Sequence, residues 1–261
     1  TFNNLLEKIA ADNKYLKELF IEENKRKNYQ EYILRFFALR NFNEYSSSIG
    51  KTMNNFMAKH QNDDDKQIED SKKLFNGTID IIKQVLGNTA FSAYDRQNHC
   101  FMNKFSGSVY DSIAIACSMY APNDLMRHAD EIRNKIVKIK ESDLKYSDYT
   151  YAATGSKERV IGRIMLIYNA IGEILGKNSN TGTARTFTEQ DKQLLWHDDY
   201  ICSYCGQKIL DLSDAEMDHI LPFSQGGETI IQNAQLLHRH CNREKYNHIE
   251  IDSVNFEDDD N

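Results

Sequence analysis

The chain has 261 residues, of which 40% are hydrophobic and 27% are charged, and its formal net charge is −7. This composition is typical of a soluble protein with a buried core, and it excludes a disordered polymer. No apolar run approaches the roughly 20 residues of a bilayer span, and the start lacks the regions of a signal peptide. We therefore expect a cytoplasmic protein without membrane contact. The chain begins with Thr1 instead of Met, which we interpret as a processed chain or as the C-terminal part of a longer protein.

The first part of the chain, to about residue 176, shows the periodicity of one helix after another. Apolar side chains recur at steps of three and four residues, which marks the buried stripe of an amphipathic helix. The chain contains two prolines, Pro122 and Pro222, so little interrupts these helices. The pattern predicts a helical bundle. The clearest series are Ile33, Phe36 and Phe37; Ile79, Ile82, Val85 and Leu86; and Ile161, Ile164, Met165, Tyr168, Ile171 and Leu175.

Three polar stretches predict the loops between these helices. They span residues 41–48, 61–66 and 143–157. Three consecutive aspartates in the second stretch, from Asp63 to Asp65, favour a solvated tip or a helix cap. Pro122 predicts a turn followed by a helix that begins near Asp124.

Two groups of side chains in this region have a plain structural interpretation. Cys100 and Cys117 lie in apolar helical contexts, which indicates buried thiols. We interpret five basic residues as part of a solvated helix face. The alternative is that they contact DNA or another domain. These residues are Lys25, Arg26, Lys27, Arg35 and Arg40.

Residues 176–185 are small and polar and lack periodicity, which is typical of a domain linker. The predicted parts are a helical domain over 1–180, a second domain over 186–256 and a disordered acidic tail over 257–261. Just after the linker, Thr188 predicts the N-cap of a short helix.

The charge is distributed unevenly between these parts. Residues 186–261 contain 5 Lys and Arg against 16 Asp and Glu, whereas residues 1–185 contain 27 against 23. An acidic end is unusual for a nucleic-acid-binding protein, because Lys and Arg normally supply most of the affinity for phosphates. If this end acts on nucleic acid, bound divalent cations, the N-terminal region or sequence outside the chain must supply the attraction.

Cysteine and histidine recur in ligand-like spacing in the second domain. Cys202 and Cys205 are separated by two residues, which lets both thiolates reach one tetrahedral ion, and His238 and Cys241 repeat this gap. Three thiolates and one imidazole suit structural Zn²⁺, which would stabilise a domain too small for a large core. His240 is the alternative to His238 as a ligand. Ordinary core or surface thiols are the alternative to a zinc site.

Asp218 and His219 lie in a short apolar segment that predicts a strand ending at Pro222. Adjacent side chains on a strand face opposite ways, so we expect a twist or a bulge if both serve one site. A neutral imidazole can take a proton from water near neutral pH, and a carboxylate beside it can hold a hard divalent cation that neutralises a phosphate. An ordinary surface or core pair is the alternative for two such residues in isolation.

Residues 200–248 resemble the HNH endonuclease family in the order and spacing of their motifs. These motifs are Cys-x-x-Cys-Gly, Asp-His-Ile-x-Pro, Gly-Gly, Asn, Cys-Asn and a following Lys. The resemblance implies a ββα-metal fold with His219 as the general base. The further roles that it implies are catalytic Mg²⁺ (or Mn²⁺ or Ni²⁺) ligands at Asp218 and Asn242, orientation of the His219 loop by Asn233, and a place near the phosphate for Lys245. The family usually has Cys where this chain has His238.

The helical part resembles the helical region of GmrSD-like restriction proteins. The matching features are Ile33 to Leu39 followed by Tyr45, Ser48 and Phe56-Met57, and Ala153-Thr-Gly-Ser156 followed by Val160 and Arg163. Those proteins have an N-terminal ParB-like nucleotide-hydrolysing domain, and fusions that end in an HNH module resemble the present arrangement. The resemblance implies that a domain of this kind, outside the present chain, is a partner.

The sequence therefore predicts a mainly α protein, with an N-terminal helical domain followed by a small zinc-stabilised ββα-metal domain. We expect a metal-dependent endonuclease that hydrolyses DNA phosphodiester bonds in bacterial restriction and anti-phage defence. Two alternatives stay open. One is a zinc-binding module that recognises nucleic acid or protein without cutting, and the other is an RNase or nickase that needs a partner chain. The oligomeric state is open as well.

Overall fold

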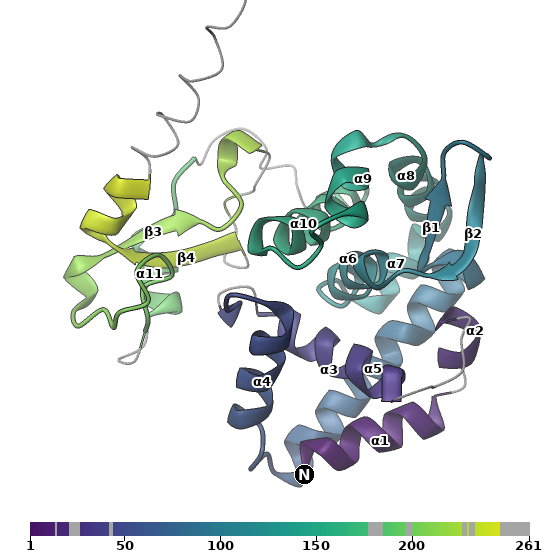
Figure 1. Cartoon of the computed structure of the whole chain (residues 1–261), viewed down its shortest axis with the longest axis horizontal. Helices are drawn as coiled ribbons and strands as arrows, with labels where there is room; N and C mark the ends of the chain where they lie inside the picture. Colours follow the sequence, from purple (N-terminus) through teal and green to yellow (C-terminus); the bar gives the residue numbers. More distant parts are fainter. Residues whose placement is uncertain are drawn as a thin grey trace, which may run out of the picture. The chain divides into compact units, whose positions relative to one another are not determined.

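The computed structural model describes residues 1–13, 15–20, 27–41, 44–176, 185–196, 200–225, 229 and 233–245. The chain divides into two compact units, which are Thr1–Gly182 (unit 1) and Thr183–Asn261 (unit 2). Figure 1 shows the elements of each unit. Several features singled out in the sequence lie outside the described residues: most of the linker, at 177–184, the acidic tail at 257–261, Lys25, Arg26, and the Gly-Gly pair at 226–227.

Unit 1 is built mainly from α-helices, which confirms the predicted fold class (Figure 1). Its α-helices are α1 (Phe2–Asp12), α2 (Leu16–Phe20), α3 (Asn28–Leu39), α4 (Ile49–Lys59), α5 (Asp65–Leu86), α6 (Gly107–Cys117), α7 (Pro122–Arg127), α8 (Ala129–Ser142), α9 (Leu144–Tyr151) and α10 (Lys157–Ile174), with a 3-10 turn, η3 (Gly87–Thr89), after α5. Within the described ranges, no helix combines the length and the apolar character needed to cross a bilayer.

Helix α6 is buried over nearly its whole length. Residues 108–117 are all buried, because apolar or small side chains occupy every side of the helix. One of them is Cys117, which confirms the predicted buried thiol. Helix α6 packs chiefly against α10. At Gly162 of α10, an added Cβ would lie 2.4 Å from Cε2 of Tyr149, so this glycine lets α9 approach α10 closely.

Two of the predicted helix starts have the expected local chemistry. Asp64 caps α5, because its carboxylate accepts a hydrogen bond from the Gln67 N–H (2.8 Å) and the Gln67 side chain accepts one from the Asp64 N–H (2.8 Å). This capping box confirms the cap predicted among the three aspartates. Pro122 is the first residue of α7, close to the predicted start at Asp124.

A β-hairpin interrupts the helices of unit 1, which contradicts the prediction of helices throughout. Strands β1 (Ser92–Asp95) and β2 (Cys100–Phe105) pair antiparallel. The Asp95 carboxylate accepts hydrogen bonds from two backbone N–H groups of the turn, which is chemistry typical of Asp in tight turns. Cys100 is therefore exposed on a strand, and the prediction of a buried helical thiol was wrong.

The loop predicted over residues 143–157 contains a helix, α9. Asp143 caps this helix by accepting a hydrogen bond from the Tyr146 N–H at 2.7 Å. The buried contacts of α9 come from Tyr146 and Tyr149. The sequence of α9 is rich in Tyr, Ser, Thr and Asp and has no aliphatic stripe, so the periodicity did not reveal it.

A buried ion cluster joins α3, α6 and α10. Asp111 accepts two hydrogen bonds from Arg35 (2.6 Å each) and one from Arg163 (2.6 Å). The side chains of Asp111 and Arg163 are fully buried, and that of Arg35 is 13% exposed. The prediction of a solvated face was therefore wrong for Arg35. Arg40 is half-buried and donates to a serine hydroxyl, whereas the exposed Lys27 agrees with the prediction.

Unit 2 is small and has the ββα order that the fold prediction requires. Its elements are α11 (Glu189–Leu195), the 3-10 turn η4 (Leu212–Asp214), β3 (Ala215–His219), the 3-10 turn η5 (Phe223–Gln225), β4 (Ala234–His238) and a helix over 239–245. Strands β3 and β4 pair antiparallel with a continuous register. Thr188 and Asp191 form a capping box at the start of α11, which confirms the predicted N-cap.

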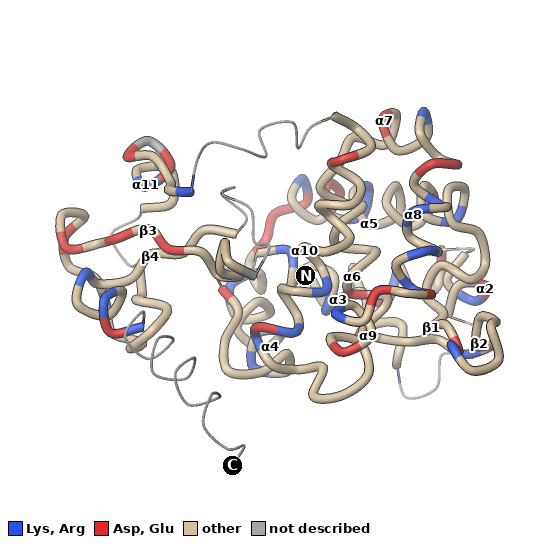
Figure 2. Tube along the Cα trace, turned by 90° about the horizontal axis from the view of Figure 1, so that it is seen from above, with Lys and Arg blue, Asp and Glu red and all other residues tan. Residues whose placement is uncertain are grey.

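The core of unit 2 contains few residues, and two of them are cysteines. The buried cluster consists of Tyr200, Cys202, Ile209, Ala215, Leu236, Leu237 and Cys241. Apolar burial of this size stabilises a domain only modestly. Figure 2 shows acidic residues on β3, in keeping with the negative charge of this part of the chain.

Candidate metal centres and active site

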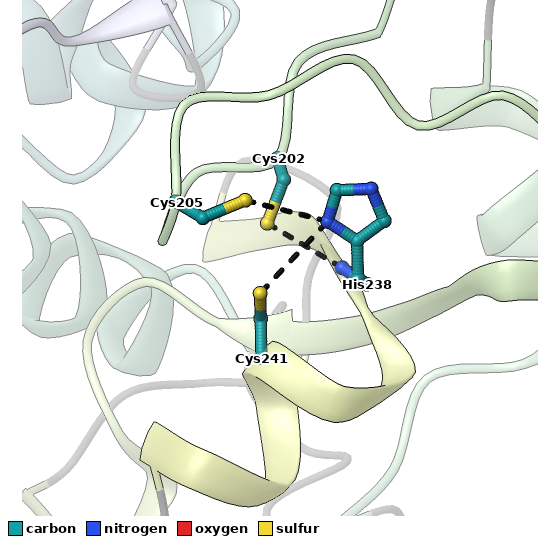
Figure 3. Close-up of side chains that lie close together, drawn as sticks. All are labelled: Cys202, Cys205, His238 and Cys241. Atoms are coloured by element: carbon teal, nitrogen blue, oxygen red, sulfur yellow. Dashed lines mark hydrogen bonds between the residues drawn. The ribbon is translucent and has the colours of Figure 1, made fainter.

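Four side chains converge in unit 2 where a turn meets the end of β4 (Figure 3). Cys202 and Cys205 lie on a turn that is closed by a hydrogen bond from the Gly206 N–H to the Cys202 carbonyl (3.0 Å). Gly206 has a φ of 74°, a conformation that glycine adopts without strain. His238 is the last residue of β4, and Cys241 lies in the first turn of the helix that follows.

The distances within this cluster fit a tetrahedral ion. The ligand atoms of all four residues lie within 4.8 Å of one another. His238 Nδ1 is 3.4 Å from Cys205 Sγ and 3.8 Å from Cys241 Sγ, close to the separation of about 3.5–3.8 Å between ligand atoms of tetrahedral Zn²⁺. His238 Nε2 lies 3.3 Å from the Lys208 carbonyl oxygen. Donation to this carbonyl would leave Nδ1 available to bind a metal ion.

The thiol pKa values indicate a site that a cation would complete. Burial alone would raise the pKa of Cys202, but three backbone N–H donors outweigh it and hold the pKa at about 7. One of these donors is the N–H of His238, 3.4 Å from the sulfur. Burial and the neighbouring thiols raise the pKa of Cys241 to about 12. Three thiolates therefore require a positive charge between them, which Zn²⁺ supplies.

The geometry favours His238 over His240 as the fourth member of the cluster. His240 is exposed, and its Nε2 lies 3.2 Å from one sulfur, that of Cys241. His238 is buried and approaches two sulfurs. The cluster thus consists of the four residues that the sequence spacing indicates.

Asp218 and His219 lie at the end of β3 and line one cavity of about 460 Å³. The register of β3 against β4 is continuous as far as His219, so the expected bulge does not occur. Instead, His219 is the last paired residue of the strand, and both side chains reach the cavity where the strand ends. The other residues that line it are Arg185, Pro222, Phe223, Ser224 and Lys245.

The buried Asp218 carboxylate accepts two hydrogen bonds at one oxygen. Lys245 Nζ lies 2.5 Å from Oδ2, and Gln235 Nε2 lies 2.9 Å from the same atom. Lys245 Nζ also donates to the His219 carbonyl oxygen at 3.2 Å. The ammonium therefore compensates a carboxylate charge that burial would otherwise destabilise.

The His219 side chain is buried against an aromatic ring. Its ring centroid is 4.5 Å from that of Phe187, and its Nε2 lies 2.9 Å from Oγ1 of Thr229. Burial lowers the pKa of His219; the Asp218 charge opposes this effect, and the Lys245 charge adds to it. The imidazole is therefore neutral near neutral pH, which is the form that accepts a proton.

Asn233 is fully buried just before β4 and holds the backbone that follows His219. Its Oδ1 accepts a hydrogen bond from the Leu221 N–H (2.9 Å), and its Nδ2 donates to the Leu221 carbonyl (3.1 Å). Its own carbonyl accepts from the Ile220 N–H at 2.8 Å. These bonds restrain the chain directly after the imidazole.

Asn242 lies on the helix over 239–245 and offers an unpaired oxygen. Its Nδ2 donates to Glu216 Oε2 at 3.0 Å, whereas its buried Oδ1 has no hydrogen-bond partner among the described residues. An unsatisfied buried acceptor costs about 1–3 kcal/mol. Asp218 lines the first cavity, whereas Asn242 lines a second cavity that also contains His219. Amide and carboxylate oxygens are ligands that hard divalent cations prefer, so each residue fits a catalytic Mg²⁺ or Mn²⁺ ion by its chemistry.

Cationic side chains gather around His219 in spite of the acidic composition of unit 2. His219 and Arg185 also line a second cavity of about 310 Å³, together with Lys192 and Arg239. Of the six Lys and Arg residues in the described part of unit 2, four therefore line one or both cavities that contain His219. Acidic side chains balance part of this charge, because Glu189 and Glu216 line the second cavity and lie 3.9 Å from Lys192 and Arg239, respectively. The cations are nevertheless placed where they can attract a phosphate.

Sequence reasoning missed two residues that contact the predicted metal ligands. Glu216 bonds to Asn242, and Gln235 bonds to Asp218. Strand alternation places Glu216 on the same face of β3 as Asp218, so this signal was present in the sequence. Gln235 is the direct partner of Asp218 across the two strands, which becomes evident only once the strands are paired.

A comparison with known families finds one match. Residues 202–248 match the family model described as HNH endonuclease. No curated protein and no solved structure matches the chain. The match contains the four cysteine and histidine residues of the cluster and the Asp218–His219 pair, and it supports a metal-binding nuclease module in unit 2. It does not extend into unit 1, whose resemblance to GmrSD-like proteins stays a prediction.

Proposed function

We propose that unit 2 is a metal-dependent endonuclease that hydrolyses DNA phosphodiester bonds. The observation that carries this proposal is the cavity in which a buried neutral imidazole, His219, lies beside a carboxylate, Asp218. The family match of residues 202–248 supports the nuclease class. The assignment of DNA as the substrate goes beyond what this match supports and belongs to the proposal.

His219 is the proposed general base. A ring nitrogen of the neutral imidazole takes a proton from water, and the oxygen of that water forms a bond to the phosphorus. The bond between the phosphorus and the leaving oxygen breaks, and that oxygen takes up a proton and leaves as a hydroxyl. Asn233 fixes the backbone after His219 through its bonds to Leu221, so the imidazole keeps its position in the cavity. Positioned proton transfer of this kind contributes about 10²–10⁴-fold to a rate.

Asp218 and Asn242 are the proposed ligands of the catalytic Mg²⁺, with Mn²⁺ or Ni²⁺ as substitutes. Such an ion supplies positive charge to the phosphate and to the leaving oxygen. Lys245 lines the same cavity as His219, so we assign its ammonium to the phosphate as well. The proposed structural ion is Zn²⁺, held by Cys202, Cys205, His238 and Cys241.

A nucleic-acid substrate is supported by the cations around His219. Arg185 lines both cavities, and its guanidinium stacks over the ring of Phe223 at 5.8 Å. Phe223 is 45% exposed, and an exposed ring beside a guanidinium can stack on a base while the cation binds a phosphate. We assign this pair to the strand that is cut.

We extend the proposal to bacterial restriction and anti-phage defence, which would place the protein in the cytoplasm. This part rests on the resemblance of residues 33–57 and 153–163 to the helical region of GmrSD-like proteins. The proposed partner is a ParB-like nucleotide-hydrolysing domain outside the present chain. A nuclease with few cations of its own would depend on such a partner to deliver DNA.

Conversion of supercoiled plasmid by the full chain tests the proposed activity. We expect nicked or linear product with Mg²⁺ or Mn²⁺ and none with EDTA. Asn242→Ala should lose this activity at unchanged zinc content. A zinc-loaded protein that binds DNA but does not cut it with any of these cations would contradict the proposal and favour the non-cutting module. Cleavage of RNA in place of DNA would favour the RNase.

A further inference from the structure

Helix 239–245 and strand β3 present two matched pairs of side chains. Asn242 contacts Glu216 (Nδ2 to Oε2, 3.0 Å), and Lys245 contacts Asp218 (Nζ to Oδ2, 2.5 Å). Asn242 and Lys245 are three residues apart, which places them on one face of the helix. Glu216 and Asp218 are two residues apart, which places them on one face of the strand. Glu216 therefore lies next to one proposed metal ligand in each element, Asp218 on the strand and Asn242 on the helix.

The contact with Glu216 determines which end of the Asn242 amide remains available for a ligand. An amide has a donor end, Nδ2, and an acceptor end, Oδ1, whereas an ionised carboxylate only accepts hydrogen bonds. Nδ2 must therefore point to Glu216. Within the part of the chain that the structure describes, the Asn242 Oδ1 is left buried and without a hydrogen-bond partner.

A second contact restrains Glu216 itself. Its other oxygen, Oε1, lies 3.9 Å from Arg239 Nε, and the residue is only partly exposed. Arg239 is on the same helix as Asn242, one turn away. Both carboxylate oxygens of Glu216 thus face residues of this helix, so the contact with Asn242 has a fixed direction.

We propose that Glu216 is a positioning residue that fixes the Asn242 amide so that Oδ1 faces the catalytic cation. An unpaired buried acceptor is unfavourable by itself, and a divalent cation would satisfy it. The inference rests on the proposed function, because it assumes a cation at Asp218 and Asn242. Glu216 acts on that cation through Asn242, and not through its own charge.

Mn²⁺ affinity, measured by electron paramagnetic resonance on the zinc-loaded full chain without nucleic acid, tests this role. Asp218→Ala identifies which part of the signal belongs to the site. Glu216→Gln keeps an acceptor oxygen for Asn242 Nδ2 and removes the charge, so we expect an affinity near that of the wild type. Glu216→Leu removes the acceptor, so we expect the affinity to fall by about 10- to 100-fold, as for other residues that orient metal ligands.

Two controls accompany this test. Glu244 provides a matched charge control, and the Asn242→Asp background provides a site that has no amide to orient. Glu244 is exposed on the same helix, so Glu244→Gln removes the same charge without touching Asn242 and should leave the Mn²⁺ affinity unchanged. Asp at position 242 has two equivalent oxygens and needs no orientation. In the Asn242→Asp background, Glu216→Leu should therefore not weaken Mn²⁺ binding.

Three results would overturn the inference. Equal losses in Glu216→Gln and Glu216→Leu would show that the charge matters, and unchanged affinity in Glu216→Leu would show that Glu216 has no role. Absence of an Asp218-dependent Mn²⁺ site in the wild type would remove its premise. Zinc content measured on each variant shows that unit 2 is folded. If the affinity pattern holds while no nucleic acid is cut, the proposed function fails and the positioning role of Glu216 stands.

Discussion

Asp218 and His219 are neighbours in the chain, yet their surroundings give them different chemistry. The imidazole packs on Phe187 in a buried position, which keeps it neutral. The carboxylate accepts hydrogen bonds from Lys245 and Gln235, which compensate its charge. A proton acceptor and an oxygen ligand thus lie side by side, and their roles follow from contacts that neither residue type specifies alone.

Replacing Asn233 should show whether this residue supports the His219 loop, because the substitution leaves the His219 imidazole itself unchanged. Asn233→Ala leaves the Leu221 N–H and carbonyl without their buried partners, which costs about 1–3 kcal/mol for each group. We expect unit 2 to lose stability, as measured by urea unfolding followed through Trp196, the one tryptophan of the chain. Cleavage should fall as well. Unchanged cleavage and an unchanged unfolding midpoint would show that these bonds do not support the loop.

Lys140 gives unit 1 a stability that depends on pH. Its Nζ is buried and donates to the carbonyl oxygens of Thr89 (3.2 Å), Ala90 (2.7 Å) and Ser92 (3.2 Å). Burial lowers its pKa from 10.5 to about 7. Between these values the unfolded chain binds more protons than the folded one, so the free energy of unfolding rises with pH.

The matched variant for this effect is Lys140→Met, which cannot titrate. The difference in unfolding free energy between the wild type and Lys140→Met should increase from pH 7 to pH 9, with a slope approaching about 1.4 kcal/mol per pH unit. Urea unfolding followed by far-ultraviolet circular dichroism measures it. A difference that stays constant over this pH range would mean that Lys140 remains charged in the folded protein.

At the scale of elements, short-range patterns were predictable and tertiary contacts were not. The cap at Asp64 depends on neighbours in sequence. The Cys and His cluster joins residues 33 positions apart, but it consists of two local pairs with the same ligand-like spacing, so spacing and residue type sufficed. The hairpin at 92–105 was missed because its strands are short and carry few aliphatic residues. The burial of Arg35 depends on Asp111, 76 residues away, and the contact of Glu216 with Asn242 depends on how β3 meets the following helix. No local pattern reports such contacts.

Removing the zinc ligands should affect unit 2 and leave unit 1 intact. Cys205→Ser removes one of the four proposed zinc ligands, and we expect lower zinc content together with a lower melting temperature for the Trp196 signal. The helical circular dichroism signal of unit 1 should change little. Wild-type protein treated with a strong chelator should behave in the same way. An unchanged Trp196 transition at reduced zinc content would argue against a structural ion.

At the scale of the whole molecule, the two units differ in charge and in the source of their stability. Unit 1 has an extended apolar core, centred on the buried helix α6. Unit 2 has a small core that includes two cysteines of the zinc cluster. Residues 1–185 have a positive charge balance and the rest a negative one. If unit 2 acts on DNA as proposed, the helical part or a partner would have to attract the DNA.

Fragment 1–182 should therefore fold without metal. We expect a helical circular dichroism spectrum and a cooperative thermal transition that EDTA does not change, because the buried residues of unit 1 come from its own helices. The full chain in EDTA serves as the comparison. A random-coil spectrum of the fragment would place the domain boundary elsewhere.

The central claim is that unit 2 hydrolyses DNA with His219 as the base. Its most direct test is the cleavage rate of a labelled DNA duplex by zinc-loaded wild type and His219→Ala in Mn²⁺, with zinc content and melting temperature measured on the same samples. We expect a rate about 10²–10⁴-fold lower in the variant, with both proteins equally folded and equally loaded with zinc. Equal rates in the two proteins would remove His219 as the base, and no metal-dependent cleavage by either would contradict the nuclease itself.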